Sequence, residues 1–405
     1  MPPMTLPLIV RRSLRQHALS TGITAASIAL AGGLLMSVWT VKEQSRAAFT
    51  QMNAGFDAAL GARGAKLQLV LNSVFHLDES SGNLAWADFL QVRTNPLVAA
   101  ALPLAVGDNY KGYRLVGTMT NLFTDFEAGP GRKLRVAPGG RAFEMGFTEA
   151  VVGSFVAQRL RLGVGDKFHP YHGLLYDEKQ QPHDETYVVT GVLEPSNTPA
   201  DRVIWIPLEG IQNMKGHDTK TAEDISAVLV KLRTPMAGRQ LDDLYNKQGN
   251  RLTFAWPIAR VVAQLFDKIA WFDKVLELVA YLVAVVATGS VLASIYNSMN
   301  ERRRDIAILR ALGARSGTIF SAVVLEAAAI ATLGMTAAFV VYAVIVVAVA
   351  GMIRAQTGVV LDPLAWNPIL VWAPLAMISL SALGGIVPAV KAYRTNVAEN
   401  LSPVS

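Results

Sequence analysis

The chain has 405 residues, of which 52% are hydrophobic and only 17% are charged. Ordinary soluble domains carry roughly 25% charged residues, so the composition indicates an integral membrane protein with a soluble middle part. The formal net charge of +6 is modest, and the basic residues cluster beside apolar runs, which is typical of membrane orientation and not of nucleic-acid binding. Cysteine is absent, which excludes disulfides and thiolate metal sites.

The first apolar run follows a short basic segment. Residues 1–17 combine apolar and basic side chains and predict a cytoplasmic amphipathic helix at the membrane surface. Residues 18–41 are long enough, as a helix, to cross a hydrocarbon core of roughly 30 Å. This run exceeds the apolar region of a cleaved signal peptide, so we expect an uncleaved first transmembrane helix. Ala25, Ala29 and Gly33 recur every four residues and predict a face for close helix packing.

Residues 42–270 change to a polar, Gly- and Pro-containing sequence with short alternating patterns. These patterns predict an extracytoplasmic α+β domain with stalk helices at its two ends. Predicted strands cover 66–71, 113–117, 167–168, 186–192, 202–206 and 227–232, and predicted helices cover 148–162 and 235–247.

Three further apolar runs follow this domain. We expect transmembrane helix 2 at 271–298, a cytoplasmic segment at 299–318, helix 3 at 319–353, a periplasmic loop at 354–368, helix 4 at 369–390 and a cytoplasmic tail at 391–405. The short basic flanks place both termini and the 299–318 segment in the cytoplasm. The expected fold class is therefore an α+β membrane protein with four transmembrane helices and a large α+β domain between helices 1 and 2.

The 299–318 segment carries an amphipathic pattern. Ile306, Leu309 and Leu312 share one helical face, Ile308 lies beside them, and Gly313 fits a helix C-cap. The apolar stripe predicts a helix that packs against a partner. The alternative is a solvated basic loop that only sets membrane orientation.

A carboxylate lies within the third apolar run. Glu326 costs several kcal/mol there unless it is paired, hydrated or protonated. One interpretation is a polar contact that steers helix movement or partner association. The other is a carboxylate satisfied near the cytoplasmic interface by Arg315 or by a hydroxyl such as that of Ser316.

Three histidines share one polar stretch of the middle domain. His169 and His172 form a His-x-x-His pair, and His183 follows eleven residues later. Imidazoles are common zinc ligands, so the three predict a zinc site if the stretch forms a hairpin. The alternative is an exposed hairpin whose histidines only form hydrogen bonds.

The layout and several motifs resemble the FtsX/MacB/LolC-type permease family of ABC systems. The central motif runs from Asn300 to Ala314 and contains the candidate coupling residues Glu301, Arg304, Asp305, Ile306, Ile308, Leu309, Leu312 and Gly313. Glu326 followed by Gly334, and the 388–394 tail, also match. In the middle domain, 149–153, 162–166 and 188–193 are similar to a MacB-type periplasmic core.

This resemblance implies a permease subunit, not an enzyme, in a bacterial inner membrane. Two copies, identical or different, would dimerise, and each would bind one ATPase subunit through the 299–318 segment as a coupling helix. ATP cycles would then move the outer domain, for export or extraction by mechanotransmission. The sequence contains no Gly-x-x-x-x-Gly-Lys-Ser/Thr motif, so ATP and Mg²⁺ are expected on the partner ATPase, with no cofactor on this chain apart from the zinc alternative.

Two other functions stay open at this point. The chain resembles FtsX, which suggests a regulator of a periplasmic cell-wall hydrolase, and the histidines suggest a component of a zinc-linked transport system. The large outer domain favours transport over the FtsX-like alternative. A periplasmic partner protein and membrane lipid are expected contacts, and nucleic acid is not.

Overall fold

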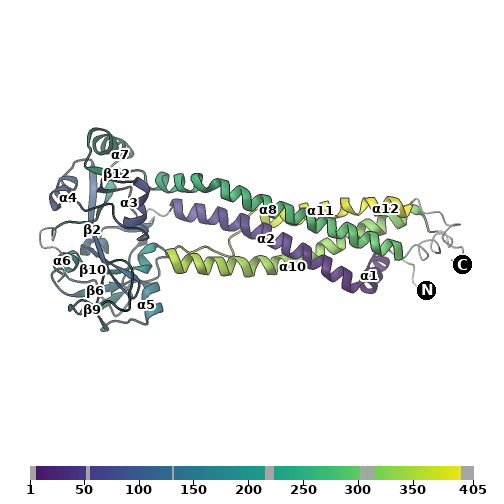
Figure 1. The fold of residues 1–405 in the computed structure, drawn as a ribbon, viewed down its shortest axis with the longest axis horizontal. Helices are drawn as coiled ribbons and strands as arrows, with labels where there is room; N and C mark the ends of the chain where they lie inside the picture. The colour runs from purple at the N-terminus through teal and green to yellow at the C-terminus, as the bar shows by residue number, and fades with distance from the viewer. Residues whose placement is uncertain are drawn as a thin grey trace. The chain divides into compact units, whose positions relative to one another are not determined.

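The computed structural model describes residues 6–51, 55–129, 132–214, 223–301, 308 and 314–393. The chain divides into two compact units (Figure 1). The helical unit comprises Met1–Gln44, Ala270–Ala350 and Asp362–Ser405, and the α+β unit comprises Ser45–Ile269 and Gly351–Leu361. The expected fold class is confirmed, because a mixed α/β domain lies in sequence between the first long apolar helix and the other three.

Four helical segments of the described chain are long and apolar enough to cross a membrane. They are α2 (Ala18–Gln51), α8 (Ile258–Glu301), α10 (Ser316–Thr357) and the pair α11 (Ile369–Gly384) and α12 (Ile386–Tyr393), and α1 (Leu6–Gln16) precedes them. The 42 residues of α10 extend about 63 Å, which is twice a hydrocarbon core of roughly 30 Å. Each of α2, α8 and α10 contributes residues to both units.

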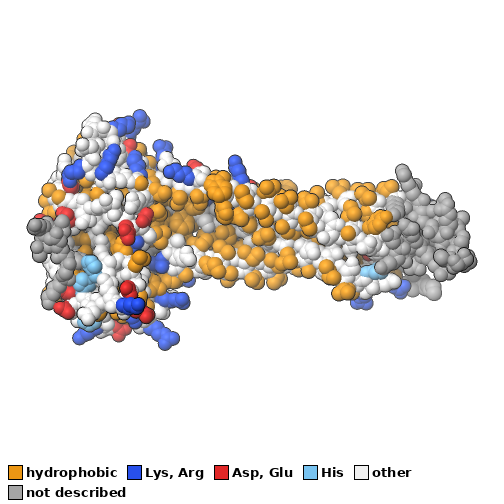
Figure 2. Space-filling view, in the orientation of Figure 1, with side chains coloured by type: hydrophobic (Ala, Val, Ile, Leu, Met, Phe, Trp, Pro, Cys, Tyr) orange, Lys and Arg blue, Asp and Glu red, His pale blue; other side chains and the backbone are white. Residues whose placement is uncertain are grey.

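The long helices present apolar side chains outward as well as inward. Figure 2 shows hydrophobic side chains over the visible face of these helices, and Val286, Val340 and Trp372 are each about two-thirds exposed. Such a surface is unfavourable in water and favourable in hydrocarbon. The helices therefore have the surface of membrane-spanning elements.

Small residues let α2 and α10 approach closely inside the helical unit. A Cβ atom added at Gly33 would lie 2.6 Å from Val341 Cβ, and one added at Gly334 would lie 2.6 Å from Ile28 Cβ. Ala29 is also buried. The predicted small-residue face of the first span is therefore confirmed, and its partner is α10, where dispersion contacts replace the hydrophobic effect as the packing force.

The α+β unit contains a mixed ten-stranded sheet within the described residues, with the order β12-β1-β11-β2-β3-β10-β6-β9-β7 and β8 paired to β2. Strand β2 (Val98–Tyr110) joins two parts of this sheet. Its first half pairs with β11 (Ala227–Leu232), and its second half pairs with β3 (Tyr113–Thr118). The sheet therefore has a first part, β12 to β2, and a second part, β2 to β7, which share one strand.

The other elements have the following bounds. The strands are β1 (Ala58–Ala62), β4 (Glu127–Gly129), β5 (Arg132–Lys133), β6 (Glu149–Val152), β7 (Lys167–Phe168), β8 (Tyr171–His172), β9 (Tyr187–Val192), β10 (Ile204–Pro207) and β12 (Leu252–Ala255). The helices are α3 (Lys66–Ser73), α4 (Trp86–Arg93), α5 (Ser154–Leu160), α6 (Leu208–Gln212) and α7 (Pro235–Asp242), with single turns at Thr120–Leu122 and Pro199–Arg202 and a π-helix at Asp243–Gln248.

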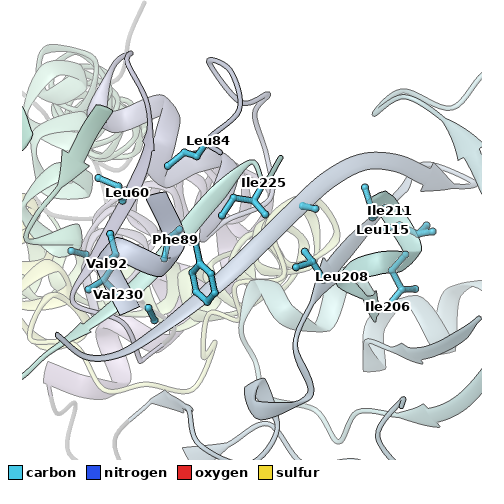
Figure 3. Packing of buried hydrophobic residues seen from close by; sticks show 14 of the residues in the cluster. Leu60, Leu84, Phe89, Val92, Leu115, Ile206, Leu208, Ile211, Ile225 and Val230 are labelled. Carbon is cyan, nitrogen blue, oxygen red and sulfur yellow. The ribbon is translucent and has the colours of Figure 1, made fainter. Parts of the chain in front are cut away.

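Each face of the sheet buries its own apolar core, because successive strand residues point to opposite faces. In β10, Ile204 and Ile206 belong to one core and Trp205 to the other. Figure 3 shows the first of these cores, in which Phe89 and Leu208, from helices α4 and α6, pack over residues of both sheet parts. The scaffold of the unit is therefore one sheet with a core on each face.

Two sequence predictions in this unit are wrong. Residues 66–71, predicted as a strand, form helix α3, in which Leu69, Val70 and Ser73 are buried on one helical face. The 148–162 segment, predicted as one helix, begins as β6 and becomes helical only after Gly153. A Cβ at Gly153 would collide with the backbone of Asp201, so a close approach of two chain segments decides where the strand ends.

His76 lies just after helix α3. Its ring makes an edge contact with Trp205, a residue of the second core, at a centroid distance of 5.5 Å. Burial, and secondly the charge of Arg114, lower the pKa of His76 to about 3. The imidazole is therefore neutral in the folded chain at neutral pH.

Candidate functional site

The N-terminal helix α1 is joined to α10 through the carboxylate within the apolar segment. Ser13 is 5% exposed, and its hydroxyl donates a hydrogen bond to Glu326 Oε1. The opposite side of α1 carries Arg11, Arg12 and Arg15, all exposed. A hydroxyl partner of Glu326 thus comes from α1, a helix that the sequence analysis did not connect with this carboxylate. Spacing could not reveal this contact, because the two residues are separated by more than 300 positions.

The candidate coupling segment is described only in part. Glu301 is the last residue of α8, and the side chain of Ile308 is 42% exposed. The other predicted coupling residues, Arg304, Asp305, Ile306, Leu309, Leu312 and Gly313, lie outside the described residues. Their role stays a prediction.

Two ion pairs join α2 to α8. Lys42 Nζ lies 2.5 Å from Glu277 Oε1, and Arg46 Nη2 lies 2.8 Å from Asp267 Oδ1. The first pair is partly buried, with side-chain exposures of 33% and 21%, so it is less screened by solvent than the second. These pairs hold the two helices in register where they leave the apolar segment.

A third connection is made by the chain that follows α10. Residues Gly351–Leu361 belong to the α+β unit, and Val359 and Leu361 are buried. Gly358 has a φ of +76°, and a Cβ there would lie 3.0 Å from the carbonyl oxygen of Thr198. The end of α10 and its loop therefore pack on the turn that precedes β10.

That turn is closed by its own hydrogen bonds. The Asp201 carboxylate accepts hydrogen bonds from the backbone N–H groups of Ser196 and Asn197 and from the Ser196 hydroxyl, at 2.7–3.1 Å. Asp201 is 4% exposed, and charge-assisted bonds of this kind are among the stronger ones in proteins. The Asp201 carboxylate therefore ties the turn together immediately before β10.

The histidine cluster differs from the set predicted by the sequence. His172 and His183 converge on Asp108: His172 Nδ1 and His183 Nε2 each lie 3.5 Å from Asp108 Oδ1. His169 is exposed and is not part of this group. Asp108 is fully buried on β2, a strand that the sequence analysis missed.

The register of the sheet explains this convergence. Asp108 on β2 and His172 on β8 are directly paired across the two antiparallel strands. The backbone N–H of His183 donates to the carbonyl oxygen of Pro170 at 2.8 Å, which brings the third residue to the same place. Burial, and secondly the nearby Asp108 and Glu185 carboxylates, raise the pKa of Tyr187 above its ordinary value.

Comparison with known proteins assigns the family. The family model "MacB-like periplasmic core domain" matches residues 21–243, more than half of the chain, and the model "FtsX-like permease C-terminal" matches residues 277–397. No protein of curated function matches the sequence.

Two solved structures resemble part of the chain. The periplasmic region of MacB from Actinobacillus actinomycetemcomitans is 13% identical, with 53% of this chain and 94% of that chain covered and a TM-score of 0.35. The extracellular domain of the noncanonic ABC-type transporter YknZ from Gram-positive bacteria is 17% identical, with 48% and 97% covered and a TM-score of 0.30. The assignment rests on the family models, which together span the first apolar helix, the α+β unit and the three later apolar helices: the chain belongs to the FtsX/MacB type of ABC transporter permeases.

Proposed function

We propose that this permease works by mechanotransmission: a separate ATPase subunit moves the long helices, and the helices move the α+β unit. One observation carries the proposal, namely that α2, α8 and α10 each contribute residues to both units. Two contacts support it: the ion pair Lys42–Glu277 and the close approach of Gly358 to the Thr198 carbonyl oxygen. Both resist slipping of a long helix against the structure beside it. Such an arrangement exports or extracts a substrate from the outer side of the bacterial inner membrane.

The proposal also assigns an orientation and an assembly. Both termini and the 299–318 segment lie in the cytoplasm, because basic flanks of short loops stay on that side. The apolar stripe of Ile306, Leu309 and Leu312 docks in a groove of the ATPase, as amphipathic helices do in apolar grooves. Two permease copies and two ATPase subunits form the working complex, and the ATPase subunits bind the ATP and Mg²⁺.

The movement can be measured directly because the 405-residue sequence has no cysteine. A single cysteine at Met236, which is 64% exposed on α7, accepts a spin label without a background signal. We expect the distance between the two labels of a reconstituted dimer to change when ATP is bound and to return after hydrolysis. An identical distance distribution in all nucleotide states of a complex that hydrolyses ATP would refute mechanotransmission.

The ATPase contact has a separate test. Leu309→Asp places a charge in the apolar stripe and should abolish co-purification of the ATPase. Ala311→Asp adds the same charge on the opposite side of the helical pattern and should leave the complex intact. Equal retention of the ATPase by both variants would contradict the coupling-helix assignment.

A further inference from the structure

We propose that Asp108, His172 and His183 form a binding site for a divalent transition-metal ion, with Zn²⁺ as the ion that fits best. One nitrogen or oxygen atom from each of the three residues lies within 4.8 Å of the others. The site is defined by this geometry and does not depend on how the permease moves.

The distances suit a metal better than direct hydrogen bonds. Both imidazole nitrogens lie 3.5 Å from the same Asp108 oxygen. Charged N–H···O bonds are shorter, at about 2.7–2.9 Å. Two ligands of a tetrahedral zinc ion, each about 2.05 Å from the metal, lie about 3.3 Å apart. The two N···O distances are therefore close to the spacing of zinc ligands, and the two imidazole nitrogens, which lie within 4.8 Å of each other, would move together when the ion binds.

The three donors are held by backbone structure. Asp108 and His172 are a register pair of β2 and β8. Asn109, next to Asp108, donates from its side chain to the carbonyl oxygens of Gly173 and Leu175 at 2.9 and 3.3 Å. The loop that leads to His183 is thus tied to the same strand. A site whose ligands are already in place loses little conformational entropy on binding.

Burial and donor type decide which ion the site takes. Asp108 has no exposed side-chain surface, the His183 side chain is 9% exposed, and the His172 side chain is 56% exposed. Two imidazoles and one carboxylate suit zinc and its neighbours in the first transition row, whereas Ca²⁺ and Mg²⁺ prefer sets of oxygen ligands. The exposed side of His172 leaves a fourth position open to water or to a donor from another molecule.

The set Asp108, His172 and His183 differs from the set predicted from the sequence by one residue. His169 was expected as a ligand because it precedes His172 in a His-x-x-His pattern. In the structure, His169 is exposed and separate from the group, and Asp108 takes its place. His169 is therefore a matched control for the two proposed imidazole ligands.

The test uses the full chain, purified in detergent through a tag without histidine and stripped with a chelator. Zn²⁺ is titrated against a chromophoric competitor, bound metal is counted by elemental analysis, and Co²⁺ reports the geometry by its visible absorption. We expect one Zn²⁺ per chain and a tetrahedral Co²⁺ spectrum. His172→Ala and His183→Ala should each weaken binding more than about tenfold, and His169→Ala should leave it unchanged.

His172→Ala is the decisive variant, because the His172 side chain is 56% exposed and its loss should not impair folding, whereas Asp108→Asn changes a fully buried group. Absence of stoichiometric Zn²⁺ from the wild-type chain would overturn the proposal. So would undiminished affinity in both His172→Ala and His183→Ala, or a loss of affinity in His169→Ala equal to theirs.

Discussion

Replacing Gly334 by alanine should push α2 and α10 apart. The new Cβ would lie 2.6 Å from Ile28 Cβ and 2.9 Å from the backbone carbonyl oxygen of Ala25. No side-chain rotation relieves a contact with a backbone oxygen, so the helices themselves must shift. Overpacking of this kind costs about 1–3 kcal/mol, and the higher helix propensity of alanine returns at most about 1 kcal/mol. The expected net effect is a destabilisation of up to about 3 kcal/mol.

Gly351 supplies the control on the same helix. A Cβ at Gly351 meets nothing within 4 Å, so Gly351→Ala should be neutral or slightly stabilising. Unfolding is followed for both variants by titration with SDS in mixed micelles, with tryptophan fluorescence as the readout. The reasoning fails if Gly334→Ala unfolds at the same SDS fraction as Gly351→Ala, because the close approach of α2 and α10 would then be incorrect.

Three further predictions concern other contacts. The pKa of His76 is about 3 in the folded chain and near 6.5 in the unfolded chain. The free energy of unfolding should therefore fall by about 2 kcal/mol from pH 8 to pH 5, as the unfolded chain takes up a proton that the folded chain does not. Chemical denaturation at both pH values measures this loss, and the variant His76→Asn should lack it. Ser13→Ala removes the hydrogen bond to Glu326 and should cost about 1–3 kcal/mol in SDS titration, whereas Ser13→Thr keeps a hydroxyl and should cost less. Gly358→Ala, at a φ of +76° and against the Thr198 carbonyl, should cost about 1–3 kcal/mol and reduce the ATP-driven change in spin-label distance while ATP hydrolysis continues.

The helical unit was predictable from the sequence because a bilayer accepts few backbone arrangements. Backbone polar groups must be satisfied inside a spanning segment, so long apolar runs become helices. The predicted stalk helix at the end of the 42–270 domain and the second predicted span form one helix, α8, from Ile258 to Glu301. The partner of the small-residue face was not predictable, because helix neighbours depend on tertiary packing.

The α+β unit was predictable only where strands are short and strongly alternating. The sequence prediction missed β2, whose 13 residues include Pro103 and Gly107, two residue types that are disfavoured in strands. Pro103 lies in the half that pairs with β11, and Gly107 lies at the register shift between β2 and β3, so both residues occur where the ladder tolerates them. Because the prediction missed β2, it also missed Asp108 as a candidate ligand. Asp108 and His172 are 64 positions apart in the sequence, and only the register of the sheet brings them together.

The sheet topology indicates how helix movement would act within the α+β unit. Strand β1 follows α2 in sequence and β12 precedes α8, and these two strands are paired, with Ala59 opposite Ala255. The α10 loop instead packs on the turn before β10, in the second part of the sheet. In the proposed mechanism, movement of α2 and α8 therefore acts on the first part of the sheet, and movement of α10 acts on the second part. Because β2 is the strand common to both parts, a difference between these two movements would bend or twist the sheet at β2. The Asp108 site lies on the half of β2 that belongs to the second part, so a bound metal would stiffen that part without locking it to the first.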